Sequence, residues 1–318
     1  MAGGCVIGVD LGGTKLLAGA VDADLRVHHR AHRLPRVRDT AALVDLVVAE
    51  VREVQQAAGE EVRAVGFGIP SLMDLARGVA VHTTHLPLRD APIRDLLAER
   101  LGVPVVVDND ATCAMLAEHH AGAAMGARHA VLLTIGTGIG GGLVVDGRIV
   151  RGAVGAAAEL GHVVVDLDGP PCQGSCPNNG CLEVMASGSA LGREALRVAR
   201  AAPDSGLGRA LAAGTEVTGA LCTELAHDGD QAARDVVALI GRRLGVGIAS
   251  FVNVFNPEVV VVGGGVIAAG ELLLEPARQE VARRALRPSR DVVRIVQARF
   301  GADAGMLGAA LLAMEAAR

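Results

Sequence analysis

A chain of 318 residues has room for about two domains, and its 51% of hydrophobic residues can bury a large core. The formal charge of −5 is mixed along the chain, and no basic stretch with interleaved aromatic residues occurs, so we expect no nucleic acid partner. The first residues lack a basic segment and the uncharged stretches are short and rich in Gly and Thr, so we expect neither a signal peptide nor a membrane span or membrane partner. We therefore expect a cytoplasmic protein, whose six cysteines lie in a reducing compartment.

The first motif in chain order is a glycine-rich turn. Residues 5–10 and 16–22 predict two strands, so the sequence Asp-Leu-Gly-Gly-Thr-Lys that links them closes a hairpin around Lys15, the single lysine among 30 basic residues. A P-loop is excluded, because it needs a helix after the loop and ends in Gly-Lys-Ser/Thr. The backbone N–H groups of such a turn bind phosphate oxygens, and Asp10 at the strand end can hold Mg²⁺. A plain tight turn is the alternative.

A helix over 41–57, a strand over 62–70, a helix over 93–101 and a strand over 103–110 follow. The last strand ends in three polar residues, Asp108, Asn109 and Asp110. Ligands of α/β sheets bind at the carboxyl ends of strands, and an Asp accepts the proton of the acceptor hydroxyl in many phosphoryl transferases. We therefore expect Asp110 to act as a general base and Asn109 to orient the acceptor. Capping of the next helix is the alternative role of Asp110.

The same plan repeats from residue 130. Residues 130–149 predict strand, Gly/Thr turn and strand, and residues 256–265 predict a strand that ends in glycines. The turn matches G-x-G-x-x-G at 136–141, but a strand follows it, whereas a dinucleotide fingerprint opens a helix. A second phosphate-binding hairpin is therefore favoured. The glycines after the strand suit a backbone that lies flat against an adenine, and close packing of strand and helix is their alternative role.

Two hairpins of this kind, each opening an α/β half, predict a duplicated α/β architecture. We expect its hinge near residues 108–112 and a closing helix over 304–318. The core must be aliphatic, because the chain has four Phe and no Trp or Tyr.

The most specific motif is a cluster of cysteines. His162, Cys172, Cys176 and Cys181 fall within twenty residues in a loop rich in Pro, Gly and Asn, and three thiols with one imidazole complete a tetrahedral zinc site. A disulfide with one thiol left over is the alternative. The remaining cysteines, Cys5, Cys113 and Cys222, lie in apolar patterns and are expected in the core. Glu159 and Glu183 flank the cluster, and sugar hydroxyls are suitable partners for their carboxylates.

These motifs together resemble the ROK family (repressors, open reading frames, sugar kinases). DLGGTK, the Asn-Asp-Ala of 109–111, TIGTGIGGG, AELGH and the Gly-Cys-Leu-Glu of 180–183 come in the order found in that family and span nearly the whole chain. The resemblance implies a two-lobed α/β fold, the actin-like ATPase or ribonuclease-H-like fold. Residues 1–108 with 302–318 would form the small lobe, and residues 109–301 the larger lobe with the zinc loop.

The resemblance also implies roles for individual residues. Asp110 is the base, and in the family the histidine of ELGH shares its ring nitrogens between zinc and the sugar, which assigns both ligands to His162. The sugar-binding residues implied are Thr84, Asn109, Asp110, Glu159, His162 and Glu183. The nucleotide-binding residues implied are Asp10, Gly12, Gly13, Thr14, Lys15, Thr137, Gly138, Gly264 and Gly265, with Asp10 also holding Mg²⁺.

The activity implied is that of a sugar kinase that uses ATP and Mg²⁺ and carries a structural Zn²⁺. The chain most resembles the bacterial glucokinases of the family, which phosphorylate glucose at the 6-hydroxyl; an N-acetylhexosamine such as N-acetylmannosamine is the second acceptor, and fructose the third. A sugar sensor without catalysis is the non-enzyme alternative. Two departures bear on the substrate: Ser71 and His85 replace residues common in glucokinases. The zinc loop reads C-x3-C-x4-C, where many members read C-x-C-x4-C. The family also suggests a homodimer or homotetramer.

Overall fold

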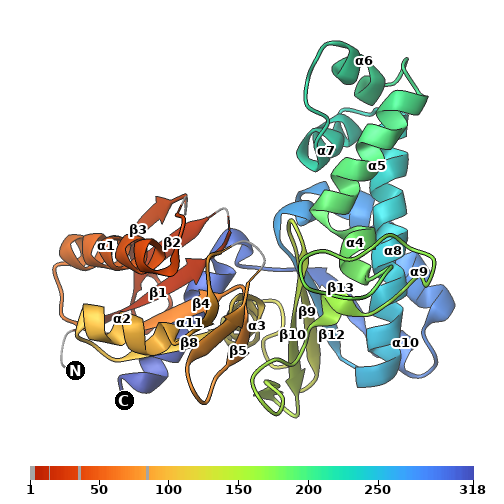
Figure 1. Ribbon diagram of the computed structural model, residues 1–318. Coiled ribbons are helices and arrows are strands. Elements are labelled where there is room, and N and C mark those ends of the chain that lie inside the picture. The colour runs from red at the N-terminus through yellow and green to blue at the C-terminus, as the bar shows by residue number, and fades with distance from the viewer. Residues whose placement is uncertain (1–3, 14, 35–36, 84–85) are drawn as a thin grey trace. The chain divides into compact units, whose positions relative to one another are not determined.

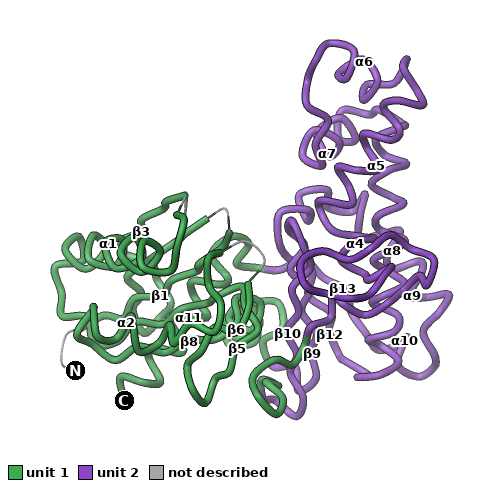
Figure 2. Tube along the Cα trace, in the orientation of Figure 1, with its two compact units in different colours: residues 1–125, 149–158, 299–318 green, residues 126–148, 159–298 purple. Residues whose placement is uncertain are grey.

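The two glycine-rich turns expected from the sequence each close a hairpin, and each hairpin opens a sheet (Figure 1). The computed structural model describes residues 4–13, 15–34, 37–83 and 86–318. The chain divides into two units (Figure 2): the first comprises residues 1–125, 149–158 and 299–318, and the second comprises residues 126–148 and 159–298.

The main sheet of the first unit has the strand order β3-β2-β1-β4-β8. Its strands are β1 (Cys5–Leu11), β2 (Leu16–Val21), β3 (Val27–Arg33), β4 (Val62–Ile69) and β8 (Val105–Asn109). Strands β1, β2 and β3 form an antiparallel meander, and β4 and β8 continue the sheet parallel to β1. The carboxyl ends of β1, β4 and β8 therefore lie at one edge. A smaller sheet contains β5 (Leu72–Asp74), β6 (Val79–His82) and β7 (Arg89–Ala91).

Alternating side chains of β1 supply two cores, one on each face of this sheet. Ile7, Val9 and Leu11 pack with α1 (Thr40–Ala58) and α2 (Ile93–Leu101). Val6 packs in a second core with α3 (Asp110–Ala121) and α11 (Ala304–Ala316), and η3 (Gly301–Asp303) precedes α11.

Glycine allows the last helix to approach the sheet closely. A Cβ on Gly8 would lie 2.1 Å from the carbonyl oxygen of Met306 in α11. The expected closing helix, α11, thus packs on the sheet of the first unit, although it comes last in the chain.

The second unit repeats the strand plan with the order β11-β10-β9-β12-β13. Its strands are β9 (Ala130–Ile135), β10 (Ile139–Val145), β11 (Arg148–Ile149), β12 (Val259–Gly263) and β13 (Arg294–Gln297). Here too an antiparallel hairpin is followed by parallel strands. The helical elements are η1 (Leu160–His162), α4 (Leu182–Ala186), α5 (Gly188–Ala201), α6 (Gly206–Ala212), α7 (Gly219–His227), α8 (Gln231–Phe255), η2 (Gly265–Ala269), α9 (Glu271–Arg284) and α10 (Ser289–Val292). The duplicated architecture expected from the two hairpins is present.

The division of the chain differs from the expected one. We expected the second lobe to begin at residue 109 and the hinge to lie near 108–112, but the first unit continues to residue 125 and also includes residues 149–158. Its last segment begins at residue 299 rather than at the expected residue 302. The physical reason is that α3 follows β8 without a linker and packs, with Ala117, against Met306 and Ala310 of α11. None of the described helices is long and apolar enough to cross a membrane.

Candidate active site

The turn after β1 places an acid and the single lysine side by side. Lys15 Nζ lies 3.7 Å from Asp10 Oδ2 and donates a hydrogen bond of 2.8 Å to the carbonyl of Ala302, just before α11. Burial raises the pKa of Asp10 to about 7, nearby Asp110 adds to the rise, and Lys15 opposes it. The turn is closed by a 2.6 Å hydrogen bond from the Gly12 N–H to the Lys15 carbonyl. Gly13 lies in the same turn, and Thr14 lies outside the described residues.

The carboxyl end of β8 brings the second acid to the same edge of the sheet. Asn109, not Asp110, caps α3: its Oδ1 accepts hydrogen bonds from the N–H groups of Ala111 and Thr112 at 2.9 and 3.0 Å. The alternative role that the sequence left to Asp110 therefore falls to its neighbour. Asp110 lies in the first helical turn, where the N–H groups of the helix favour a carboxylate. It is close enough to Asp10 to raise the pKa of that group.

Asp110 Oδ1 accepts a 2.8 Å hydrogen bond from the Ala111 N–H, and both carboxylate oxygens of Asp108 also have partners. The side chain is 3% exposed, Oδ2 accepts a 2.7 Å hydrogen bond from Arg151 Nε, and Oδ1 accepts a 2.9 Å bond from the Asn109 N–H. Burial raises its pKa, and Arg151 opposes the rise. Sequence reasoning missed Arg151. The one available signal was an arginine at the start of a run of Gly and Ala that leads to Glu159.

The second hairpin turn, in the other unit, is shaped by hydrogen bonds from neighbouring helices. Its carbonyl groups accept from the start of α5: Gly188 N–H bonds to Gly136 at 2.8 Å and Ser189 Oγ to Thr137 at 2.8 Å. Glu183 of α4 accepts a 2.8 Å bond from the Ile139 N–H. Its carboxylate also lies against Gly138, where a Cβ would approach Glu183 Oε2 to 2.2 Å.

The glycines after β12, Gly264 and Gly265, differ in their surroundings. Gly264 has φ +85°, and a Cβ there would lie 2.4 Å from the carbonyl oxygen of Ile135, so close packing with the end of β9 requires a glycine. A Cβ on Gly265 would meet no atom within 4 Å. The backbone at Gly265 is therefore open to a ligand.

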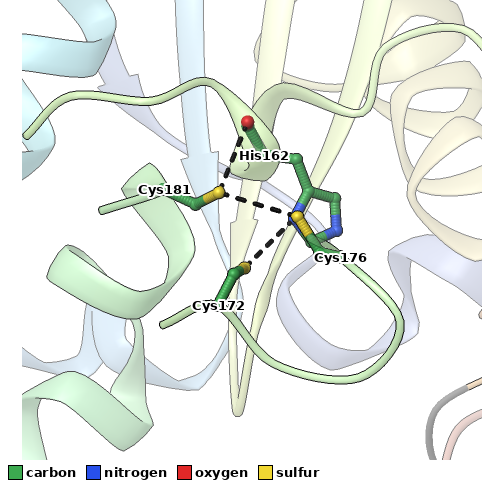
Figure 3. Close-up of side chains that lie close together, drawn as sticks. All are labelled: His162, Cys172, Cys176 and Cys181. Carbon is green, nitrogen blue, oxygen red and sulfur yellow. Dashed lines mark hydrogen bonds between the residues drawn. The ribbon is translucent and has the colours of Figure 1, made fainter. Parts of the chain in front are cut away.

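The cysteine cluster comes together in the second unit (Figure 3). Cys172 Sγ lies 3.5 Å from His162 Nδ1, and Cys176 Sγ lies 3.8 Å from Cys181 Sγ. All four ligand atoms lie within 4.8 Å of one another. Burial, with the neighbouring thiols, raises the pKa of Cys172 to about 12. No disulfide occurs among the residues that the structure describes, and Cys5, Cys113 and Cys222 are buried, as expected.

Glu159 directly precedes η1, which carries His162. The residue is exposed, but desolvation of its carboxyl group still raises its pKa. His162 opposes this rise in the pKa of Glu159 and Glu183 adds to it, so both lie near the Glu159 carboxyl group. Ser71 is buried at the end of β4, where Asn109 Nδ2 lies 3.4 Å from its carbonyl oxygen. Thr84 and His85 lie outside the described residues.

Two sheets of one strand order, each opened by a glycine-rich hairpin, define the actin-like ATPase fold. Acids at the ends of β1 and β8 are typical of a member of that class that transfers phosphoryl groups. The chain matches the ROK family over residues 6–316 and belongs to that family.

Named relatives agree with this membership. The chain is 35% identical to a glucokinase of Streptomyces coelicolor over 316 residues, with 98% of both chains covered. It is 37% identical to a glucokinase of Thermotoga maritima over 313 residues, covering 98% of this chain and 97% of the relative. Among solved structures, it is similar to a ROK family glucokinase from Streptomyces griseus in complex with glucose and AMPPNP, with a TM-score of 0.89, 35% identity and coverage of 98% and 99%.

Proposed function

We propose that this protein is an ATP-dependent glucokinase, which transfers the terminal phosphoryl group of ATP to the 6-hydroxyl of glucose. The observation that carries the proposal is the pair of acids, Asp10 and Asp110, which lie near each other at the carboxyl edge of the first sheet. The relatives support the proposal, because the chain is similar over nearly its full length to glucokinases of two bacteria. It is also similar to the solved structure of a ROK family glucokinase with glucose and an ATP analogue.

Asp110 is the general base in this proposal. A base must reach the proton of the acceptor hydroxyl, and Asp110 is half-buried at the start of α3 with part of its surface open. Asp108 is a poor alternative, because its side chain is only 3% exposed and is held by Arg151. Oδ1 of Asn109 caps the helix and one N–H of its amide donates to the Ser71 carbonyl, so its second N–H is the group proposed to bind the sugar.

Asp10 is proposed to hold Mg²⁺, a cation that prefers carboxylate and water oxygens. Without a cation Asp10 lies near a second acid, and Lys15 supplies the opposing charge. The nucleotide phosphates are assigned to the two hairpin turns, with Gly12, Gly13, Thr14 and Lys15 in the first and Thr137 and Gly138 in the second. The open backbone at Gly265, with Gly264 holding the turn in shape, is assigned to the adenosine side of ATP.

Zinc is the metal that the cysteine cluster fits. A tetrahedral centre with Zn–S bonds of about 2.3 Å separates its ligand atoms by about 3.8 Å. The Cys172–His162 and Cys176–Cys181 distances of 3.5 and 3.8 Å suit that geometry. Three thiols and one imidazole fill every position, so the metal is structural and leaves no site open for catalysis.

The zinc site would orient a sugar ligand. Nδ1 of His162 faces the sulfur atoms, which leaves Nε2 on the other side of the ring for a hydroxyl group. We assign Glu159, Glu183 and Thr84 to the same sugar. Since the chain has no Trp or Tyr, recognition relies on hydrogen bonds, and a site built this way discriminates against analogues that leave its groups unpaired.

The experiment that tests the function is a competition among glucose, N-acetylmannosamine, N-acetylglucosamine and fructose, followed as ADP release. We expect kcat/KM for glucose to exceed that of each competitor by about tenfold or more. A tenfold preference for an N-acetylhexosamine would replace the glucokinase assignment but keep the kinase. Tight binding of a sugar without any phosphorylation would favour a sensor.

The assembly is proposed from the family resemblance alone. We expect a homodimer or homotetramer, and sedimentation equilibrium of the purified protein measures it. A monomer at micromolar concentration would contradict this expectation.

A further inference from the structure

An ion pair that the proposed mechanism does not use lies directly beside Asn109 and Asp110. Asp108 directly precedes Asn109 and Asp110, and its 3% exposed side chain pairs with Arg151 Nε at 2.7 Å. A buried carboxylate that loses its partner is strongly destabilising, since its charge then stays uncompensated. Arg151 is thus what allows a charged Asp108 at the end of β8, where its Oδ1 also accepts the Asn109 N–H.

Arg151 belongs to a segment that is fastened to the first unit at further points. Residues 149–158 group with that unit, whereas the chain on either side of them groups with the second unit. The Leu75 N–H donates to the Val154 carbonyl at 3.3 Å. Gly155 has φ +102° and packs so tightly that a Cβ would lie 2.6 Å from Leu75 Cγ. A 3.1 Å bond from the Ala157 N–H to the Arg151 carbonyl closes the segment on itself.

We infer that Arg151 is a positioning residue for the phosphoryl transfer: its ion pair with Asp108 fixes the end of β8 that carries Asn109 and Asp110, and fastens residues 149–158, which continue directly into Glu159. This inference rests on the proposed function, which gives Asp110 and Glu159 their roles. One arginine side chain therefore holds the segment that carries the base. Misplacing a catalytic group by about 1 Å costs on the order of 100-fold in rate.

Arginine suits this position better than lysine. Its guanidinium is planar and always charged, and it donates from a fixed geometry, whereas an ammonium group is a point charge on a flexible stem. Nε of Arg151 makes the bond to Asp108, so the orientation of the whole planar group is set by that contact. Arg151→Lys should keep the charge but lose part of the alignment.

The test compares four variants of the full chain: Arg151→Met, Arg151→Lys, Asp108→Asn and the double variant Arg151→Met/Asp108→Asn. Arg151→Met should lower kcat on the order of 10–100-fold, with glucose Kd within about threefold by calorimetry. Arg151→Lys should recover part of the loss. The double variant should turn over faster than Arg151→Met, because a neutral amide in place of the Asp108 carboxylate needs no counter-charge and its oxygen still accepts the Asn109 N–H.

A control removes an arginine–carboxylate contact from the second unit, where Glu194 keeps Arg197 as a second partner at 2.8 Å. Arg243 Nη1 lies 2.9 Å from Glu194 Oε1, and Arg243→Met should lower the melting temperature without changing kcat of the folded protein. If Arg151→Met changes kcat less than twofold, or if the double variant is no faster than Arg151→Met, the inference is overturned.

Hydrogen exchange separates this inference from the proposed function. In Arg151→Met, amides of residues 105–110 and 149–158 should exchange faster than in the wild type, and those of the second sheet should not. This result needs no substrate. If the wild type phosphorylates no sugar, the proposed function fails, and unchanged exchange in both segments would independently overturn the role of Arg151.

Discussion

The hairpin β1–β2 and the hairpin β9–β10 hold the same place in sheets of the same strand order, but their turns differ in charge. The first turn carries its own acid and base, Asp10 and Lys15. The second turn, residues 134–142, has no charged side chain of its own. Its Ile139 N–H instead donates a hydrogen bond to the carboxylate of Glu183 in α4. The two hairpins thus share a strand plan, but one turn contains charged side chains and the conformation of the other depends on hydrogen bonds to α4 and α5. We expect substitutions in the first unit to affect chemistry and those in the second to affect binding.

The largest effect should come from Asp110→Asn. The amide keeps the shape of the side chain but cannot accept a proton, and loss of a general base costs about 10²–10⁴-fold in rate. Steady-state kinetics should show this loss in kcat, while calorimetry shows glucose affinity nearly unchanged. Asp45→Asn, an exposed acid paired with Arg100 on α1 and α2, is the control and should be silent. A variant with near wild-type kcat would show that another group, such as Asp108, is the base.

Asp10→Asn should have the second largest effect on activity. If Asp10 holds Mg²⁺ as proposed, losing its carboxylate removes electrostatic stabilisation of the transferring group, and we expect kcat/KM for Mg·ATP to fall by about 100-fold. Glucose binding, measured without nucleotide, should stay near the wild-type value. Normal use of Mg·ATP by this variant would mean that the charged turn has no part in phosphate chemistry.

Cys176→Ser should act on binding. If the cluster binds zinc as proposed, loss of the Cys176 ligand frees His162, and disturbing the groups that orient a ligand costs on the order of 10–100-fold. We expect this loss as a higher KM for glucose, with kcat less affected, and elemental analysis should give about one zinc per chain in the wild type and less in the variant. Active wild-type protein without zinc would contradict the assignment of the cluster.

The smallest effect should come from a pair of glycine substitutions in the second turn. An alanine at Gly138 would press on Glu183 Oε2, and overpacking of about 1–3 kcal/mol should raise the KM for ATP or glucose roughly tenfold. At Gly136 a Cβ meets no atom within 4 Å, so Gly136→Ala is the matched control. Equal effects of the two substitutions would show that neighbouring helices do not shape the turn.

The features that the sequence predicted are those encoded by neighbouring residues. Both hairpins, the helices over 41–57 and 93–101 and the Cys/His cluster depend on local patterns and short spacings, and the structure has them at nearly the same residues. Strand β3 was missed because its sequence, VHHRAHR, is polar. It is a strand because it pairs with β2 at the edge of the sheet.

Features that depend on contacts between distant residues could not be predicted from the sequence. The boundary near residue 109 was misplaced because α3 packs on α11, which lies almost 200 residues later in the chain. The capping residue of α3 differed by one position, since adjacent Asn and Asp side chains are both good caps and only the backbone decides between them. The Arg151–Asp108 pair joins residues 43 apart, and no periodicity signals such a contact.

The position of α11 has a consequence for synthesis on the ribosome. Domains generally fold as units while the chain emerges from its N-terminus. The second unit is complete once residue 298 has been made, whereas the first still lacks η3 and the helix that covers Gly8 and β4. The unit that begins the chain is therefore expected to finish folding last. Until then, α3 covers this face of the sheet without α11, and Val6, Leu17 and Ala64 lack their contacts with the last helix. A nascent chain at this stage should be a substrate for chaperones.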